Sequence, residues 1–158
     1  MKKNITYKIL PQINIVVEYF SGPIHISDMI AHKKDIIKNI EFYPNINFIA
    51  DLRDSQLLYT KQELSEYVGF IKEEKKLNTH RKTAILTSTP QQVAQSTIYE
   101  SLTKDLPIRF KIFSTLQATL EWVSVKKGLE FSMIEGTILK LKNESSVRSH
   151  YSKVLQRQ

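Results

Sequence analysis

The sequence of 158 residues contains no cysteine, which excludes disulfides, thiolate metal sites, iron–sulfur clusters and catalysis by cysteine. Glycine is also rare, with Gly22, Gly69, Gly128 and Gly136 too far apart for a dinucleotide fingerprint or a phosphate-binding P-loop. The four histidines are scattered and show neither a His-Glu-x-x-His pattern nor a two-histidine, one-carboxylate spacing. We therefore expect no metal and no other cofactor.

Long apolar runs are missing as well. The longest uninterrupted apolar stretches are short segments such as Ile15-Val16-Val17, whereas a membrane span needs about 18 consecutive apolar residues. The apolar stretch that follows the basic start is broken by Lys8 and Pro11 before it could form a signal-peptide core. We expect a cytoplasmic protein without a membrane span.

The overall composition is that of a globular domain, with 41% hydrophobic and 25% charged residues, and the length suits one domain of about 150 residues. The net charge of +7 is concentrated near the end, since Lys126 to Gln158 holds seven of the 23 basic residues but three of the 16 acidic ones. We predict a domain over residues 1–125 and a basic C-terminal extension over residues 126–158. The extension is expected to be partly ordered at most, because turn and polar residues interrupt any long helix: Gly128, Gly136, Asn143, Ser145 and Ser146.

Strand patterns alternate with helix patterns along the domain. Ile5 to Leu10 and Ile13 to Phe20 are rich in β-branched and aromatic residues, and Pro11-Gln12 between them predicts a hairpin. Three further strands are predicted at Ile46 to Leu52, Thr83 to Thr87 and Ile108 to Phe113.

Four helices are predicted from their N-terminal capping residues. Ser27 is a plausible cap for the first, Thr60 with Glu63 forms a capping box, Thr89 precedes Pro90, and Ser114 or Thr115 caps the last. The order β-β-α-β-α-β-α-β-α predicts an α/β fold whose four- to five-stranded sheet is mostly parallel and begins with the hairpin.

Several segments resemble the STAS-like proteins, which share the SpoIIAA-like fold of bacterial anti-sigma-factor antagonists. They are Tyr19-Phe20-Ser21-Gly22, Ile49-Ala50-Asp51-Leu52-Arg53-Asp54, Ala84-Ile85-Leu86-Thr87 and Ile112-Phe113-Ser114-Thr115 with Ala118 and Trp122. The resemblance covers Ile5 to Val125. It implies a four- or five-stranded sheet with sequential crossovers and a regulatory protein–protein interaction instead of catalysis.

The sequence departs from these antagonists at their phosphorylation site. The resemblance would place an Asp-Ser-Ser-Gly-like stretch with a phosphorylated serine after the third strand, but this chain has Asp54-Ser55-Gln56-Leu57-Leu58-Tyr59-Thr60. The stretch lacks the glycine, and the predicted helix start is displaced to Thr60. Ser55 and Thr60 are the hydroxyls nearest to the modified position.

The candidate site lies at the carboxyl ends of the parallel strands, where open α/β sheets bind their ligands. We call the following set the strand-end site: Asp51, Arg53, Asp54, Ser55, Tyr59, Thr60, Ser88 and Thr89. These residues could hold a partner loop or a small polar ligand. In the structural alternative, the hydroxyls cap helices and Arg53 pairs with a neighbouring carboxylate. Tyr59 and Tyr99 are candidates for exposed aromatic residues at an interface.

The leading hypothesis is a non-catalytic regulatory domain that binds a protein partner at the strand-end site. Catalysis is disfavoured because no histidine or nucleophile accompanies Asp51 and Asp54 in the local sequence. The alternative is a small-ligand or lipid-binding module of the same broad fold, as in lipid-transfer domains. A homodimer through the hairpin edge or through a helix face is a further hypothesis. Nucleic acid is disfavoured as a partner, because the basic tail contains no Arg-rich run or recognised binding module.

Overall fold

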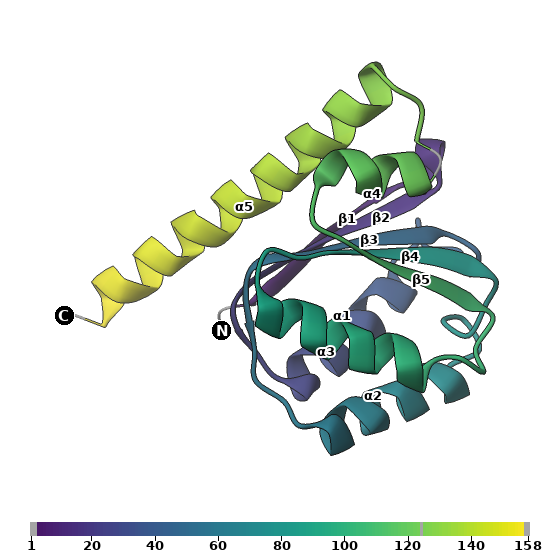
Figure 1. The fold of residues 1–158 in the computed structure, drawn as a ribbon. Coiled ribbons are helices and arrows are strands. Elements are labelled where there is room, and N and C mark those ends of the chain that lie inside the picture. The colour runs from purple at the N-terminus through teal and green to yellow at the C-terminus, as the bar shows by residue number, and fades with distance from the viewer. Residues whose placement is uncertain (1–2, 124, 157–158) are drawn as a thin grey trace.

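One five-stranded sheet forms the centre of the molecule (Figure 1). The computed structural model describes residues 3–123 and 125–156. The strands are β1 (Ile5–Leu10), β2 (Ile15–Ile24), β3 (Asn47–Leu57), β4 (Arg81–Leu86) and β5 (Ile108–Phe113). They lie side by side in chain order, and β1 pairs antiparallel with β2 while the other three pairs are parallel. The predicted mostly parallel sheet with an N-terminal hairpin is confirmed.

Helices cover both faces of this sheet. They are α1 (Ile26–Lys38), α2 (Lys61–Glu73), α3 (Pro90–Leu102), α4 (Leu116–Trp122) and α5 (Leu129–Leu155), and a short 3₁₀ turn, η1 (Pro11–Ile13), joins β1 to β2. The first three helices lie on one face, and α4 and α5 lie on the other (Figure 1). The described residues thus hold one α-helix more than the four expected.

Three of the four predicted helix caps are confirmed. The hydroxyl oxygens of Thr60, Thr89 and Thr115 accept hydrogen bonds from backbone N–H groups at the starts of α2, α3 and α4. The prediction of Ser27 as a cap is wrong. Since β2 continues as far as Ile24, α1 starts directly after it, and the Asp28 carboxylate accepts the N–H of His25 at 2.8 Å.

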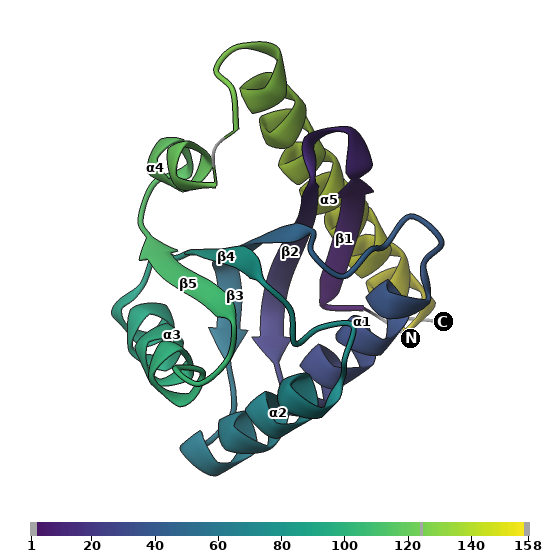
Figure 2. The same ribbon diagram turned by 90° about the vertical axis from the view of Figure 1, so that its right-hand side faces the viewer.

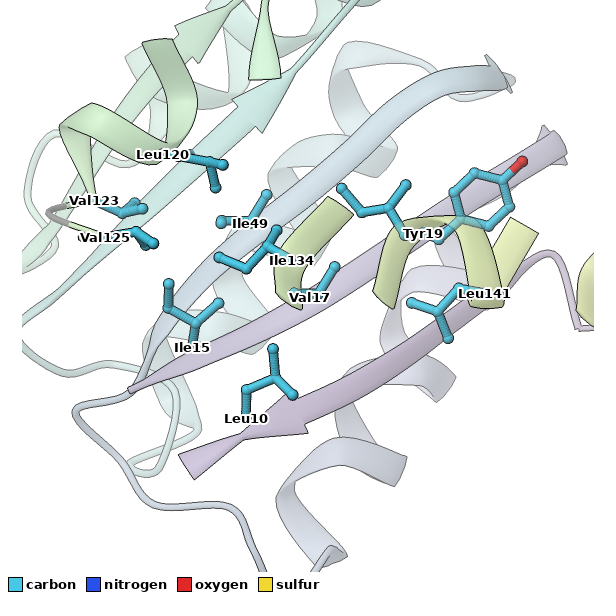
Figure 3. Close-up of a cluster of buried hydrophobic side chains, with 12 residues drawn as sticks. Leu10, Ile15, Val17, Tyr19, Ile49, Leu120, Val123, Val125, Ile134 and Leu141 are labelled. Carbon is cyan, nitrogen blue, oxygen red and sulfur yellow. The ribbon is translucent and has the colours of Figure 1, made fainter. Parts of the chain in front are cut away.

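The two faces of the sheet carry separate hydrophobic cores, because side chains alternate along each strand. On β2, Val17 and Tyr19 point towards α4 and α5, whereas Glu18 and Phe20 point towards α1, α2 and α3. Figure 3 shows the first of these cores, in which Leu120 of α4 and Ile134 and Leu141 of α5 meet the sheet.

The expectation that turn residues interrupt any long helix in the extension is wrong, because α5 is continuous from Leu129 to Leu155. Its apolar residues Ile134, Ile138 and Leu141 are buried against the sheet. Burying them stabilises the helix by more than the roughly 1 kcal/mol that a glycine such as Gly136 costs in a helix interior. The division of the chain at residue 125 stays a prediction.

Within the described ranges, no helix combines the length and the apolar character that crossing a membrane requires.

Candidate functional site

The strand-end site lies on an extension of β3. The sequence indicated a strand that emerges into solvent at Leu52, but β3 continues to Leu57. Its neighbour β2 follows it to this point, with a shift in register between Tyr19 and Ser21. Gly22, just after the shift, has a φ of 68°, which favours glycine. The other neighbour, β4, ends opposite Asp51. The last residues of β3 therefore have a strand on one side only.

Side chains from α3 and the loop before it satisfy the carbonyl groups on the open side of this extension. Ser88 Oγ donates to Arg53 O at 3.0 Å, Gln92 Nε2 to Ser55 O at 2.9 Å, Gln91 Nε2 to Leu57 O at 2.6 Å and Gln95 Nε2 to Tyr59 O at 3.2 Å. The glutamine side chains thus replace a missing strand. Sequence analysis overlooked them, although three glutamines within the first two turns of one helix were visible.

Gln92 is the centre of this arrangement and is fully buried. While its amide nitrogen donates to the β3 extension, its Oε1 accepts the backbone N–H of Ser88 at 2.8 Å and that of Thr89 at 3.3 Å. One side chain therefore joins the start of α3 to β3. The two hydrogen bonds to Gln92 Oε1 hold the exposed residues Ser88 and Thr89 in place.

Asp51 and Arg53 form a fixed pair in the middle of the site. The Asp51 side chain is almost fully buried and accepts hydrogen bonds from Arg53 Nε at 2.9 Å, Nη2 at 2.8 Å and the backbone N–H at 3.1 Å. The hydrogen bond to Asp51, which outweighs partial burial, raises the pKa of Arg53. About a third of the Arg53 side chain is exposed to solvent. The pair therefore presents an arginine of defined orientation at the surface.

Asp54 connects the strand-end site to the C-terminal helix. Its Oδ2 accepts the Tyr19 hydroxyl at 2.7 Å and lies 3.2 Å from Nζ of Lys142 on α5. The Tyr19 hydrogen bond, followed by Lys142, lowers the pKa of Asp54 despite some burial. Nearby, the Ser145 and Ser21 hydroxyls are 2.8 Å apart. Figure 3 shows Tyr19 on β2, with α5 passing beside it.

The remaining site residues are less closely associated. Ser55 lies within β3, not at a helix start, and its hydroxyl donates to Leu52 O at 2.7 Å. Thr60 is exposed and contacts Glu63 in the capping box of α2. Tyr59 is half-buried and lines a cavity in the core, and burial raises its pKa. The structure thus brings Asp51, Arg53, Ser88 and Thr89 together and leaves Thr60 apart.

The prediction of Tyr99 as an exposed interface residue is wrong. Its ring packs edge-on against Phe110 of β5, with the ring centres 4.8 Å apart, and in a tilted arrangement against Tyr67 of α2, with the centres 5.8 Å apart. Burial raises the pKa of Tyr99 to about 12.

A buried ionic cluster on β2 was not anticipated from the sequence. The Glu18 carboxylate, 1% exposed, receives Lys33 Nζ at 2.8 and 2.9 Å and His32 Nε2 at 2.6 Å. Burial alone would raise the pKa of Glu18, but the charge of Lys33 and the contact with His32 lower this pKa to about 2. The Lys33 ammonium also lies 3.9 Å from the ring centre of Phe48. Three polar residues here interrupt otherwise apolar strand and helix patterns, which is the signal that could have revealed them.

This cluster borders the core cavity, which has a volume of about 50 Å³ and lies between the sheet and α1, α2 and α3. Glu18 and Lys33 are the charged residues of its lining, and Tyr59, Tyr67 and Ser96 are among the other lining residues. Across the described residues, no three His, Asp or Glu side chains are grouped to hold a metal ion.

Comparisons with known proteins identify the fold. No family model matches the chain, and no curated protein shows significant similarity to its sequence. Among solved structures, an uncharacterized DUF3478-family protein with a SpoIIAA-like fold from Shewanella loihica PV-4 is similar, with a TM-score of 0.51 and 16% identity. The match covers 76% of this chain and 94% of that one. An anti-sigma factor antagonist from Mycobacterium paratuberculosis matches with a TM-score of 0.44 and 17% identity over 78% and 97% of the two chains.

The resemblance to STAS-like proteins is therefore confirmed for the fold: the chain has a SpoIIAA-like, mostly parallel α/β architecture. At this level of identity, the similarity establishes the fold alone.

Proposed function

We propose that this chain is a non-catalytic regulatory domain that binds a protein partner through its strand-end site. The observation that carries the proposal is the Asp51–Arg53 pair, in which a buried carboxylate fixes a partly exposed arginine. An arginine whose rotamers are already restricted loses little conformational entropy when it binds, and arginines are enriched among residues that dominate interface affinity. The proposed partner offers a carboxylate or another anionic group to Arg53.

The surroundings of Arg53 support an interface. The exposed hydroxyl-bearing residues Ser88 and Thr89 lie beside it, held by Gln92, and Asp54 adds an exposed carboxylate. The site therefore offers donors and acceptors on a rigid base. Within the described residues, the Asp51 carboxylate is engaged by Arg53 and is not free to act as a general base.

Site-specific photocrosslinking tests the proposal. A photoreactive side chain placed at exposed Gln56, beside the site, is expected to capture a defined protein from the native lysate. Arg53→Ala should abolish that product, whereas Arg109→Ala, which removes an exposed arginine on β5, should retain it. Because Arg53→Ala leaves Asp51 unpaired, Ser88→Arg provides a second variant that obstructs the surface without removing that pair. The same product in all variants would contradict the proposed site.

The core cavity favours a second candidate function, the binding of a small molecule. At about 50 Å³ it is smaller than the roughly 150 Å³ cavity that admits benzene, so a lipid chain does not fit in it. A ligand of a few atoms with a polar group near Glu18 and Lys33 is the class it would take. Native mass spectrometry would detect such a ligand as retained mass, and Ser96→Leu, which fills the cavity wall, should remove it.

A further inference from the structure

The free edge of the sheet carries a groove that lies apart from the strand-end site. Its volume is about 460 Å³, and it is lined by β1, by α1 on one side and by α5 on the other. Figure 2 shows β1 at the edge of the sheet with α1 and α5 flanking it. The two helices thus form walls around a strand that has a single neighbour.

The backbone of β1 is able to pair with a further strand inside this groove. Asn4 O accepts the N–H of Ser21 at 2.8 Å, so the backbone groups of Asn4 face β2. Because hydrogen-bonded and non-hydrogen-bonded positions alternate in an antiparallel pair, the N–H and C=O groups of Ile5 and Tyr7 face outwards. Both residues line the groove. Within the described residues, no other backbone segment pairs with them on that side.

The side chains of the groove favour a cationic occupant. Asp28 and Asp35 on α1 and Glu144 on α5 contribute three carboxylates to its lining. Lys3 is the one lysine or arginine among the described lining residues, and its Nζ is 3.5 Å from Asp35. Two further oxygen atoms, Asn4 Oδ1 and Thr6 Oγ1, are buried in the described structure without a hydrogen-bond partner. The lining of the groove therefore carries more acidic than basic groups, which favours a cationic occupant.

We propose that this groove binds an extended basic segment of a partner protein, which adds to β1 as a sixth strand. Main-chain hydrogen bonds to Ile5 and Tyr7 provide the pairing, and a lysine or arginine side chain reaches the carboxylates that line the groove. A second copy of this chain is a poorer occupant, since pairing β1 with β1 would bring two acidic grooves together. The proposal is independent of the strand-end site.

A defined peptide tests this inference. The probe is a peptide of about eight residues that alternates Lys and Thr, and its counterpart alternates Glu and Thr. We expect the Lys/Thr peptide to bind saturably and the Glu/Thr peptide not to bind. In the complex with the Lys/Thr peptide, amide exchange of Ile5 and Tyr7 should be slowed about tenfold or more. Nuclear magnetic resonance of the full chain measures both quantities.

Charge variants locate the binding site. Asp35→Asn and Glu144→Gln should each weaken binding about fivefold, whereas the exposed controls Asp105→Asn and Glu135→Gln lie outside the groove and should leave it unchanged. Absence of binding, equal binding of the Glu peptide, or binding without protection of Ile5 and Tyr7 would each overturn the proposal. Concentration-dependent protection of these amides without peptide would instead assign the edge to a homodimer and would also overturn it.

Discussion

Lys142 of α5 and Asp54 of β3 form an ion pair of 3.2 Å on the oxygen atom that also accepts the Tyr19 hydroxyl. The contact joins the C-terminal helix to the candidate partner site. A partner that competes for Asp54 would displace the Lys142 side chain, so the proposed site and α5 share one contact.

The Lys142–Asp54 pair should contribute little to stability. Both side chains are about half exposed, so a double-mutant cycle of Lys142→Ala and Asp54→Ala should give a coupling energy of about 0.2–1 kcal/mol that decreases as salt is raised. Urea denaturation measures it. The exposed neighbour Lys140 serves as control and should show no coupling to Asp54. A coupling insensitive to salt would contradict this prediction.

Leu141 should be required for stable attachment of α5. Its side chain is 6% exposed and lies in the core beside Tyr19, whereas Leu139 on the same helix is 58% exposed. Leu141→Ala should lower the free energy of unfolding by about 2–5 kcal/mol, and Leu139→Ala should change it by less than about 0.5 kcal/mol. Chemical denaturation compares the two substitutions. Equal effects would mean that α5 does not pack as described.

Gln92→Ala should be more damaging than its polar character suggests. The substitution leaves the N–H of Ser88 and the carbonyl of Ser55 without their partners in a partly buried setting, at a cost of about 1–3 kcal/mol in total. The matched control is Gln117→Ala on the exposed surface of α4, with an expected change below about 0.5 kcal/mol. Thermal and urea unfolding of both variants test the difference.

Stability should fall at acid pH partly through Glu18. Its pKa is about 2 in the folded protein against 4.5 as the ordinary value, so the folded state binds its proton less readily than the unfolded state. The contribution is fully present above pH 4.5 and is lost as the pH falls towards about 2. Denaturation curves recorded across this range measure the loss.

Glu18→Gln isolates this contribution. The variant leaves Lys33 buried without its counter-charge, so at neutral pH it should be less stable than the wild type by about 3–5 kcal/mol. Its stability should also vary less with pH between 4.5 and 2 than that of the wild type. An unchanged acid transition in the variant would contradict the assignment to Glu18.

Local sequence signals predicted the secondary structure well where neighbouring residues determine the backbone conformation. The hydroxyls of Thr60, Thr89 and Thr115 cap helices as expected, because a cap needs only the next three residues. The pattern of Ile108 to Phe113 likewise matches β5 in full. Predictions that depended on distant partners were wrong, as for the continuous α5 and the buried Tyr99.

The candidate site shows the same division. The structural alternative for Arg53, in which it pairs with a neighbouring carboxylate, is found in the structure, and the carboxylate is that of Asp51. The strand extension to Leu57 could not be predicted, because its carbonyl groups are satisfied by glutamines that lie more than thirty residues further along the chain. Hydrogen bonds of that kind leave no periodic signal in a single sequence.

By itself, the sequence determined the α/β order of elements as far as α4, the hairpin and the starts of α2, α3 and α4, since each follows from contacts within a few residues. Tertiary structure alone decided that the glycine-interrupted tail becomes one helix, that Glu18, His32 and Lys33 meet inside the protein, and that β1 borders an acidic groove. These outcomes depend on which apolar faces and which charged side chains are brought together when the helices pack on the sheet. The free energies of apolar burial and of charge desolvation then outweigh the local conformational propensities of the residues.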